Sequence, residues 1–108
     1  MAKVIKDNSV VVGHGVKLGN NVRLGAHAVV ANDCIIGDNV TVGECTVISE
    51  GAVIEDGAIV SHCVYVGPRS NIGKSAHLHS YARVGAGASV PCGSDLATGS
   101  LIPGKPRD

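Results

Sequence analysis

Histidines and cysteines are the residues of this sequence that could do chemistry, and several of them lie close together. His62 and Cys63 are adjacent, and His77 and His79 follow, separated from each other by one residue. An imidazole can act as a general base near neutral pH. Imidazole and thiolate groups are also preferred zinc ligands. The sequence therefore allows proton transfer or metal binding here, and the fold decides which side chains meet.

These residues sit in a repeat of six that runs through nearly the whole chain. A period of six is not helical, because a helical stripe returns after three, four and seven residues. Strand side chains alternate between faces, so each hexad predicts a short strand with a small residue and an aliphatic residue pointing inward. The three residues that follow form a corner, whose third member is often Gly or Asn, types that tolerate a left-handed backbone. The aliphatic position is always Val, Ile or Leu, at Val12, Leu18, Leu24, Val30, Ile36, Val42, Ile48, Ile54, Val60, Val66, Ile72, Leu78, Val84, Val90, Leu96 and Ile102.

Composition limits both the core and the partners. Tyr65 and Tyr81 are the only aromatic residues, so a core must be built from smaller aliphatic side chains and must be narrow. Lys plus Arg equals Asp plus Glu at 9 each, which argues against nucleic acid or an anionic membrane as partner. There is no membrane-length apolar run, signal-peptide pattern or C-x-x-C spacing. We expect one cytoplasmic domain over residues 1–108, with reduced thiols.

From Val10 to Ile102 the pattern resembles the hexapeptide-repeat transferase superfamily. The resemblance implies an all-β fold, a left-handed parallel β-helix with three strands in each triangular coil. Three hexads make an 18-residue coil, so the chain predicts about six coils without loop insertions, stacked ~4.8 Å apart.

Residues 18 apart then form vertical columns, and one outward column is apolar. Such a band of exposed apolar residues usually marks an interface, and the superfamily resemblance implies a homotrimer. The alternative is that β-branched residues simply suit exposed strands. The predicted interface consists of Val11, Val29, Val47, Tyr65, Ile35 and Val53.

The same stride gathers four of the five histidines at one corner. His27, Cys45, Cys63 and Tyr81 form one column there, with His62, His77 and His79 beside it. Cys45 and Cys63 fall on adjacent coils, at a spacing that permits a disulfide, although a reducing compartment favours free thiols. Cys34 points into the core.

A second resemblance concerns function. VSHCVYVG, residues 60–67, resembles the I-x-H-[DN]-x-x-I-G segment of hexapeptide acyltransferases, although Cys63 stands where relatives carry Asp or Asn. It implies that His62 is the general base in acyl transfer from a coenzyme A thioester to an amine or hydroxyl of a small-molecule acceptor. The tail GSLIPGKPRD resembles the ending of these enzymes, which bind coenzyme A between subunits along the later coils. Gly85, Ala86 and Gly87 are the predicted cofactor-binding residues.

Two other functions remain open. The uninterrupted hexads also fit a non-catalytic trimeric scaffold or oligomerisation module, because no loop projects to shape an acceptor pocket. A metal site could use His27, His77 and His79. The γ-class carbonic anhydrases resemble this chain in fold, but their pair of histidines five apart is missing, since Gly19 follows His14 at that spacing. The sequence thus favours acyl transfer over a scaffold, and both over zinc, and does not identify the acyl acceptor.

Overall fold

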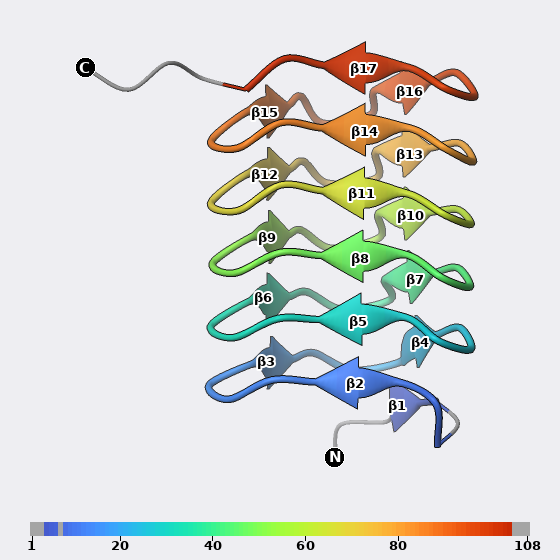
Figure 1. Cartoon of the computed structure of the whole chain (residues 1–108), viewed down its shortest axis with the longest axis vertical. Helices are drawn as coiled ribbons and strands as arrows, with labels where there is room; N and C mark the ends of the chain where they lie inside the picture. The colour runs from blue at the N-terminus through green and yellow to red at the C-terminus, as the bar shows by residue number, and fades with distance from the viewer. Residues whose placement is uncertain (1–3, 7, 105–108) are drawn as a thin grey trace.

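The computed structural model describes residues 4–6 and 8–104, which form one continuous coil of short strands (Figure 1). The chain climbs as it crosses the front of the view from right to left, so the coil is left-handed, as the resemblance implied. The described residues contain no helix, and therefore none long and apolar enough to span a membrane.

Three parallel sheets form the sides of the coil. Each strand pairs with the strand 18 residues away, as Tyr65 does with Val47 and Arg83. Sheet A contains β1 (Val4–Ile5), β4 (Val22–Leu24), β7 (Thr41–Val42), β10 (Ile59–Val60), β13 (His77–Leu78) and β16 (Asp95–Leu96). Sheet B contains β2 (Val11–Val12), β5 (Val29–Val30), β8 (Val47–Ile48), β11 (Tyr65–Val66), β14 (Arg83–Val84) and β17 (Leu101–Ile102). Sheet C contains β3 (Lys17–Leu18), β6 (Ile35–Ile36), β9 (Val53–Ile54), β12 (Asn71–Ile72) and β15 (Ser89–Val90).

Two details of the expected coil need correction. The described strands number 17, which makes five complete coils and two further strands rather than six coils. All but one of the strands have two residues instead of three. The physical reason lies in the small inward residue before each strand, whose N–H often closes the preceding turn. Ala28 N–H, for example, donates to the carbonyl of Gly25 over 3.2 Å rather than to a neighbouring coil.

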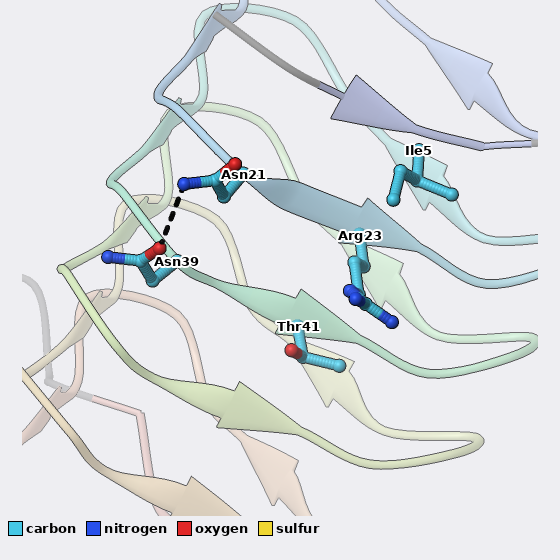
Figure 2. A pocket seen from close by; sticks show the side chains of 5 residues that line it. All are labelled: Ile5, Asn21, Arg23, Asn39 and Thr41. Carbon is cyan, nitrogen blue, oxygen red and sulfur yellow. Dashed lines mark hydrogen bonds between the residues drawn. The ribbon is translucent and has the colours of Figure 1, made fainter.

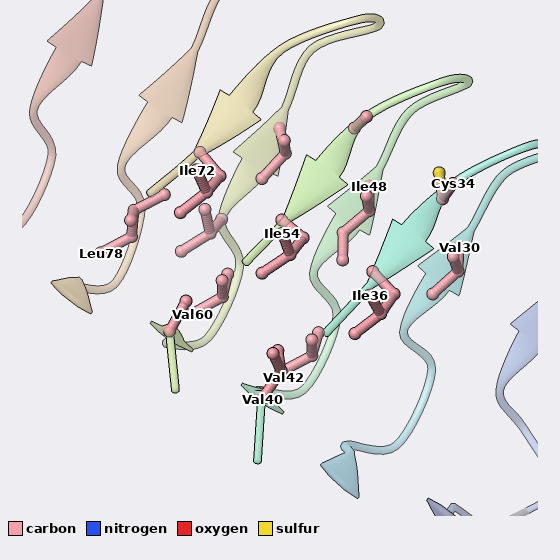
Figure 3. Packing of buried hydrophobic residues seen from close by; sticks show 14 of the residues in the cluster. Val30, Cys34, Ile36, Val40, Val42, Ile48, Ile54, Val60, Ile72 and Leu78 are labelled. Carbon is pink, nitrogen blue, oxygen red and sulfur yellow. The ribbon is translucent and has the colours of Figure 1, made fainter. Parts of the chain in front are cut away.

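The core is as narrow as the composition predicted. Stacked aliphatic side chains run along its axis, with Ile36, Ile48, Ile54 and Ile72 at most 2% exposed (Figure 3). Alanines such as Ala52 and Ala58 occupy the other inward position and are fully buried. Small residues there leave room for the aliphatic column, so the interior is filled without aromatic rings.

Two polar residues also lie in this core, and both are hydrogen-bonded. The Thr46 hydroxyl donates to the Ser61 carbonyl over 2.7 Å, and the Ser70 hydroxyl donates to the Gly67 carbonyl over 2.7 Å. Among the described residues, no buried side-chain nitrogen or oxygen lacks a partner. The core therefore carries no unpaired polar group, which would cost about 1–3 kcal/mol.

The corners adopt one backbone conformation throughout. Every sixth residue from Gly15 to Gly99 has a positive φ, between 57° and 75°. The expectation of Gly or Asn at this third corner position covers only some of them, since His27, Cys63 and Tyr81 also adopt it. Their N–H groups donate to the coil before them, and these bonds continue the ladder through the corner.

The second corner position carries a side-chain ladder that the repeat did not predict. The N–H of His14 donates to Asn32 Oδ1 over 2.8 Å, and that of Glu44 donates to His62 Nδ1 over 2.9 Å. Asn20 and Asp38 donate in the same way to the aspartate 18 residues later. All four donors follow a glycine. A Cβ at Gly43 would lie 2.8 Å from His62 Nδ1 and 2.6 Å from the Ser61 backbone.

We predict that Gly43→Ala destabilises the protein, whereas Gly51→Asn does not. The alanine methyl would force adjacent coils apart, at a cost of about 1–3 kcal/mol in the free energy of unfolding. Gly51 has a positive φ and its added Cβ would meet nothing closer than 3.5 Å. Asn21 and Asn39 already adopt that conformation, so Gly51→Asn should stay within about 1 kcal/mol of the parent. Denaturant unfolding measures both, and equal losses would contradict the prediction.

Candidate functional site

The corner between sheets A and B, here called the histidine corner, is the column that the stride predicted. Its third-position residues His27, Cys45, Cys63 and Tyr81 are all exposed and left-handed. The N–H of Cys63 donates to the Glu44 carbonyl, and that of Tyr81 to the His62 carbonyl. The backbone therefore holds successive coils of this corner in register.

His62 is exposed at this corner, and one of its ring nitrogens is already in use. Nδ1 accepts the hydrogen bond from the Glu44 N–H. A neutral imidazole has one acceptor nitrogen and one N–H, so this contact places the proton on Nε2. The arrangement matches the capping by Asn32 and Asp38 at equivalent corners. His62 thus has a backbone-capping role that the sequence did not reveal.

His77 and His79 meet a third residue, Asp95, on the outer side of sheet A. The two imidazole rings are stacked, with centroids 4.0 Å apart and planes 22° from parallel. His79 Nε2 and Asp95 Oδ1 lie 2.6 Å apart. His77 Nε2 lies 3.5 Å from Ser61 Oγ. The sequence placed His77 and His79 together but missed Asp95 as their partner, although Asp95 follows His77 by one full stride.

His27, the remaining predicted metal ligand, is not part of this group. Its column position lies three strides before Tyr81, and its backbone N–H donates to Ser9 Oγ over 2.8 Å. Among the described residues, the histidines and carboxylates that come close enough to share a cation are His77, His79 and Asp95. Including His27 was wrong because four histidines on one edge span several coils.

The cysteines divide as the sequence predicted. Cys34 is buried, its thiol donates to the Ser49 carbonyl over 3.0 Å, and burial raises the pKa of the Cys34 thiol. Cys45, Cys63 and Cys92 are exposed and free. Cys34 is therefore a core residue, held in its neutral form.

A groove of about 350 Å³ lies on sheet B near the last coils, lined by Tyr65, Arg83, Val84, Gly85 and Leu101. The Arg83 guanidinium carbon lies 5.7 Å from the Tyr65 ring centroid, a cation–π contact that holds the charge over an apolar wall. Gly85, one of the predicted cofactor residues, lines this groove. Ala86 and Gly87 are on the same corner but are not among its lining residues.

A second hollow, of about 260 Å³, lies on sheet A near the N-terminal coils (Figure 2). It is lined by Ile5, Asn21, Arg23, Asn39 and Thr41. The Asn21 side-chain amide donates to Asn39 Oδ1 over 3.3 Å, which links two coils. No predicted site residue lies in this hollow.

The apolar band on sheets B and C is only partly exposed. Val11 (56%), Ile35 (46%) and Tyr65 (37%) are exposed, and Leu101 extends the sheet B column at 68%. Val29, Val47 and Val53 are already half-buried within one chain. The band is real, and its most exposed members lie at Val11, Ile35 and Leu101.

Solved structures with this fold include proteins of several kinds. A chain in the crystal structure of the CcmM N-terminal domain in complex with CcmN aligns with 100% of this chain and 93% of its own length, at 25% identity and a TM-score of 0.77. PerB from Caulobacter crescentus, in complex with CoA and GDP-perosamine, is 18% identical with a TM-score of 0.60. That alignment covers 94% of this chain and 48% of PerB, so the chain spans about half of PerB.

A hexapeptide transferase family protein from Anaplasma phagocytophilum gives a TM-score of 0.56 at 17% identity, covering 95% of this chain and 71% of the other. At such identities, the likenesses to PerB and to this protein concern the fold alone. No curated protein matches the sequence.

The fold is therefore that of the hexapeptide acyltransferases, a left-handed coil with an 18-residue stride. A sequence profile, that of the GMPPB C-terminal domain, matches residues 2–105, nearly the whole chain. The protein belongs to the GMPPB C-terminal domain family and is built from hexapeptide repeats.

Proposed function

We propose that the protein is an acyltransferase of the hexapeptide type, which binds a coenzyme A thioester in the sheet B groove. The groove carries this proposal, because its chemistry matches the cofactor. Tyr65, Val84 and Leu101 offer apolar surface to a pantetheine arm, and Arg83 offers a cation to a phosphate. Gly85 has no side chain to obstruct close approach. PerB, which was solved with CoA, supports the view that this coil can hold the cofactor.

The transfer itself needs one proton to move. As an acceptor amine or hydroxyl attacks the thioester carbonyl, a base takes its proton, and a C–N or C–O bond forms. The C–S bond then breaks, and the departing thiolate takes up the proton. His62 is the proposed base, on its resemblance to the family segment. To serve, its Nδ1 lone pair must leave the Glu44 N–H, or its proton must move from Nε2 to Nδ1.

We predict that acetyl-coenzyme A raises the melting temperature of the protein, and that Arg83→Met reduces this shift. Loss of the cation removes the phosphate contact and should weaken binding about tenfold or more, since a hydrogen bond to a charged group contributes about 1.5–3 kcal/mol. Arg23→Met is the matched control, because Arg23 is also an exposed, outward strand residue but lies on sheet A. The measurement is thermal shift followed by calorimetric titration. If the parent protein does not bind acetyl-coenzyme A, the acyltransferase proposal is refuted.

The two roles of His62 are separated by comparing His62→Asn with His62→Ala. Asn can accept the Glu44 N–H as Asn32 accepts that of His14, but it cannot act as a base. We expect His62→Asn to keep the parent stability and lose at least about 100-fold in acyl transfer. His62→Ala should lose the activity and also about 0.5–1.5 kcal/mol of stability. Full activity in His62→Asn, with any acceptor that the parent uses, would exclude His62 as the base.

A non-catalytic scaffold is the second candidate function, and two observations favour it. The described coils contain no inserted loop, and His62 is engaged as a backbone cap. The similar chain from the CcmM–CcmN structure comes from a protein complex rather than a complex with CoA. Either function is compatible with a homotrimer assembled through the apolar band.

The assembly prediction compares Ile35→Lys with Ile59→Lys. The two isoleucines are 46% and 42% exposed, but Ile35 lies in the apolar band and Ile59 on sheet A. A buried lysine charge in an interface is strongly unfavourable, so we expect Ile35→Lys to shift the trimer towards monomer. Ile59→Lys should leave the assembly unchanged. Sedimentation velocity measures both, and a monomeric parent protein would contradict the trimer.

A further inference from the structure

The cluster of His77, His79 and Asp95 is the feature that the proposed function does not use. His77 and His79 flank the inward Leu78, so both side chains leave the same side of the strand. Asp95 is the register partner of His77 on the next coil. Two imidazoles and a carboxylate are thus fixed by β13 and β16, on a rigid backbone rather than on a loop.

The side chains are already directed toward one another. The stacked rings and the short His79–Asp95 contact orient both imidazoles. One ligand atom from each of the three residues lies within 4.8 Å of the other two. Around a tetrahedral cation with bonds of ~2.0–2.1 Å, ligand atoms lie ~3.3–3.4 Å apart. Small rotations suffice to reach this spacing, because the Asp95 and His79 side chains are 72% and 38% exposed.

We propose that His77, His79 and Asp95 form a binding site for a divalent transition-metal ion of the zinc class. Two nitrogen ligands and one oxygen ligand favour Zn²⁺, Co²⁺ or Ni²⁺ over Mg²⁺ or Ca²⁺, which prefer oxygen. Three protein ligands leave at least one coordination position open. A hollow of about 250 Å³ adjoins the site, with the small residues Ala97 and Thr98 in its lining. Water or a small exogenous ligand has room to complete the coordination there.

The ligand set is complete within one chain and does not depend on acyl transfer. Binding replaces the hydrogen bond between His79 and Asp95 with two metal–ligand bonds, and it releases any ring proton that occupied the coordinating nitrogen. Ser61 Oγ lies close enough to His77 to steady its ring when the metal is bound. The exposed Cys45 and Cys63 are the competing surface ligands that an experiment must exclude.

The test is a titration of the full, untagged, chelator-treated chain with Co²⁺ and Zn²⁺, in the presence of a non-thiol reductant. We expect one ion per chain and a Co²⁺ visible spectrum of low coordination number without a thiolate charge-transfer band. His77→Gln and Asp95→Asn should each weaken binding at least about tenfold, the lower end of the loss for groups that only support a metal ligand. Their melting temperatures without metal should match the parent, because these side chains are outside the core.

Two matched variants give the controls. His27→Gln removes a histidine from the same corner outside the cluster, and the Cys45→Ser, Cys63→Ser double variant removes the surface thiols. Both should bind as the parent does. The proposal is overturned if no stoichiometric ion binds, if Asp95→Asn binds with unchanged affinity, or if the cysteine variant loses the ion.

Discussion

The ladder of hydrogen bonds between successive coils is the constraint on which everything else in this protein depends. Val11 N–H donates to Ala28 O, and Val29 N–H donates to Thr46 O, each 17 residues further along. An inserted or deleted residue would break this register for every later strand and turn inward side chains outward. Because the stride cannot drift, the chain is a set of straight columns. Its chemistry is therefore decided by which residue types share or neighbour a column.

The columns explain how much could be predicted. The inward aliphatic residues, the three outward faces and the neighbourhood of His77 and His79 all follow from counting in steps of six and 18. The role of His62 does not, because a period gives the position of a residue but not the direction in which an N–H points. The signal was present, since a glycine precedes each of the four capped donors and an Asn, Asp or His follows that glycine 19 residues later. Asp95 was missed for a simpler reason, as its column was read for polarity rather than for pairing with His77.

The corner geometry also changes how the histidines should be interpreted. A histidine at the second corner position can accept an N–H from the preceding coil, and His62 does so in the same way as Asn32. A histidine on a strand, such as His77, projects from a sheet whose backbone hydrogen bonds are already complete. It is therefore free to interact with its column neighbours. The two chemistries considered from the sequence, proton transfer and metal binding, thus fall on structurally different positions, one at a capped corner and the other on an open sheet face.

Rigid columns also determine where selectivity could arise. The described coils carry no loop that could close over a substrate, and the grooves along them are open. An enclosed acceptor pocket would therefore need a second surface, and the apolar band beside the Tyr65–Arg83 groove is where another copy could supply one. The same argument does not apply to His77, His79 and Asp95, because three ligands from two adjacent strands are sufficient to hold an ion without a partner. Assembly and metal binding should consequently be separable properties of this chain, since they use different faces of one coil.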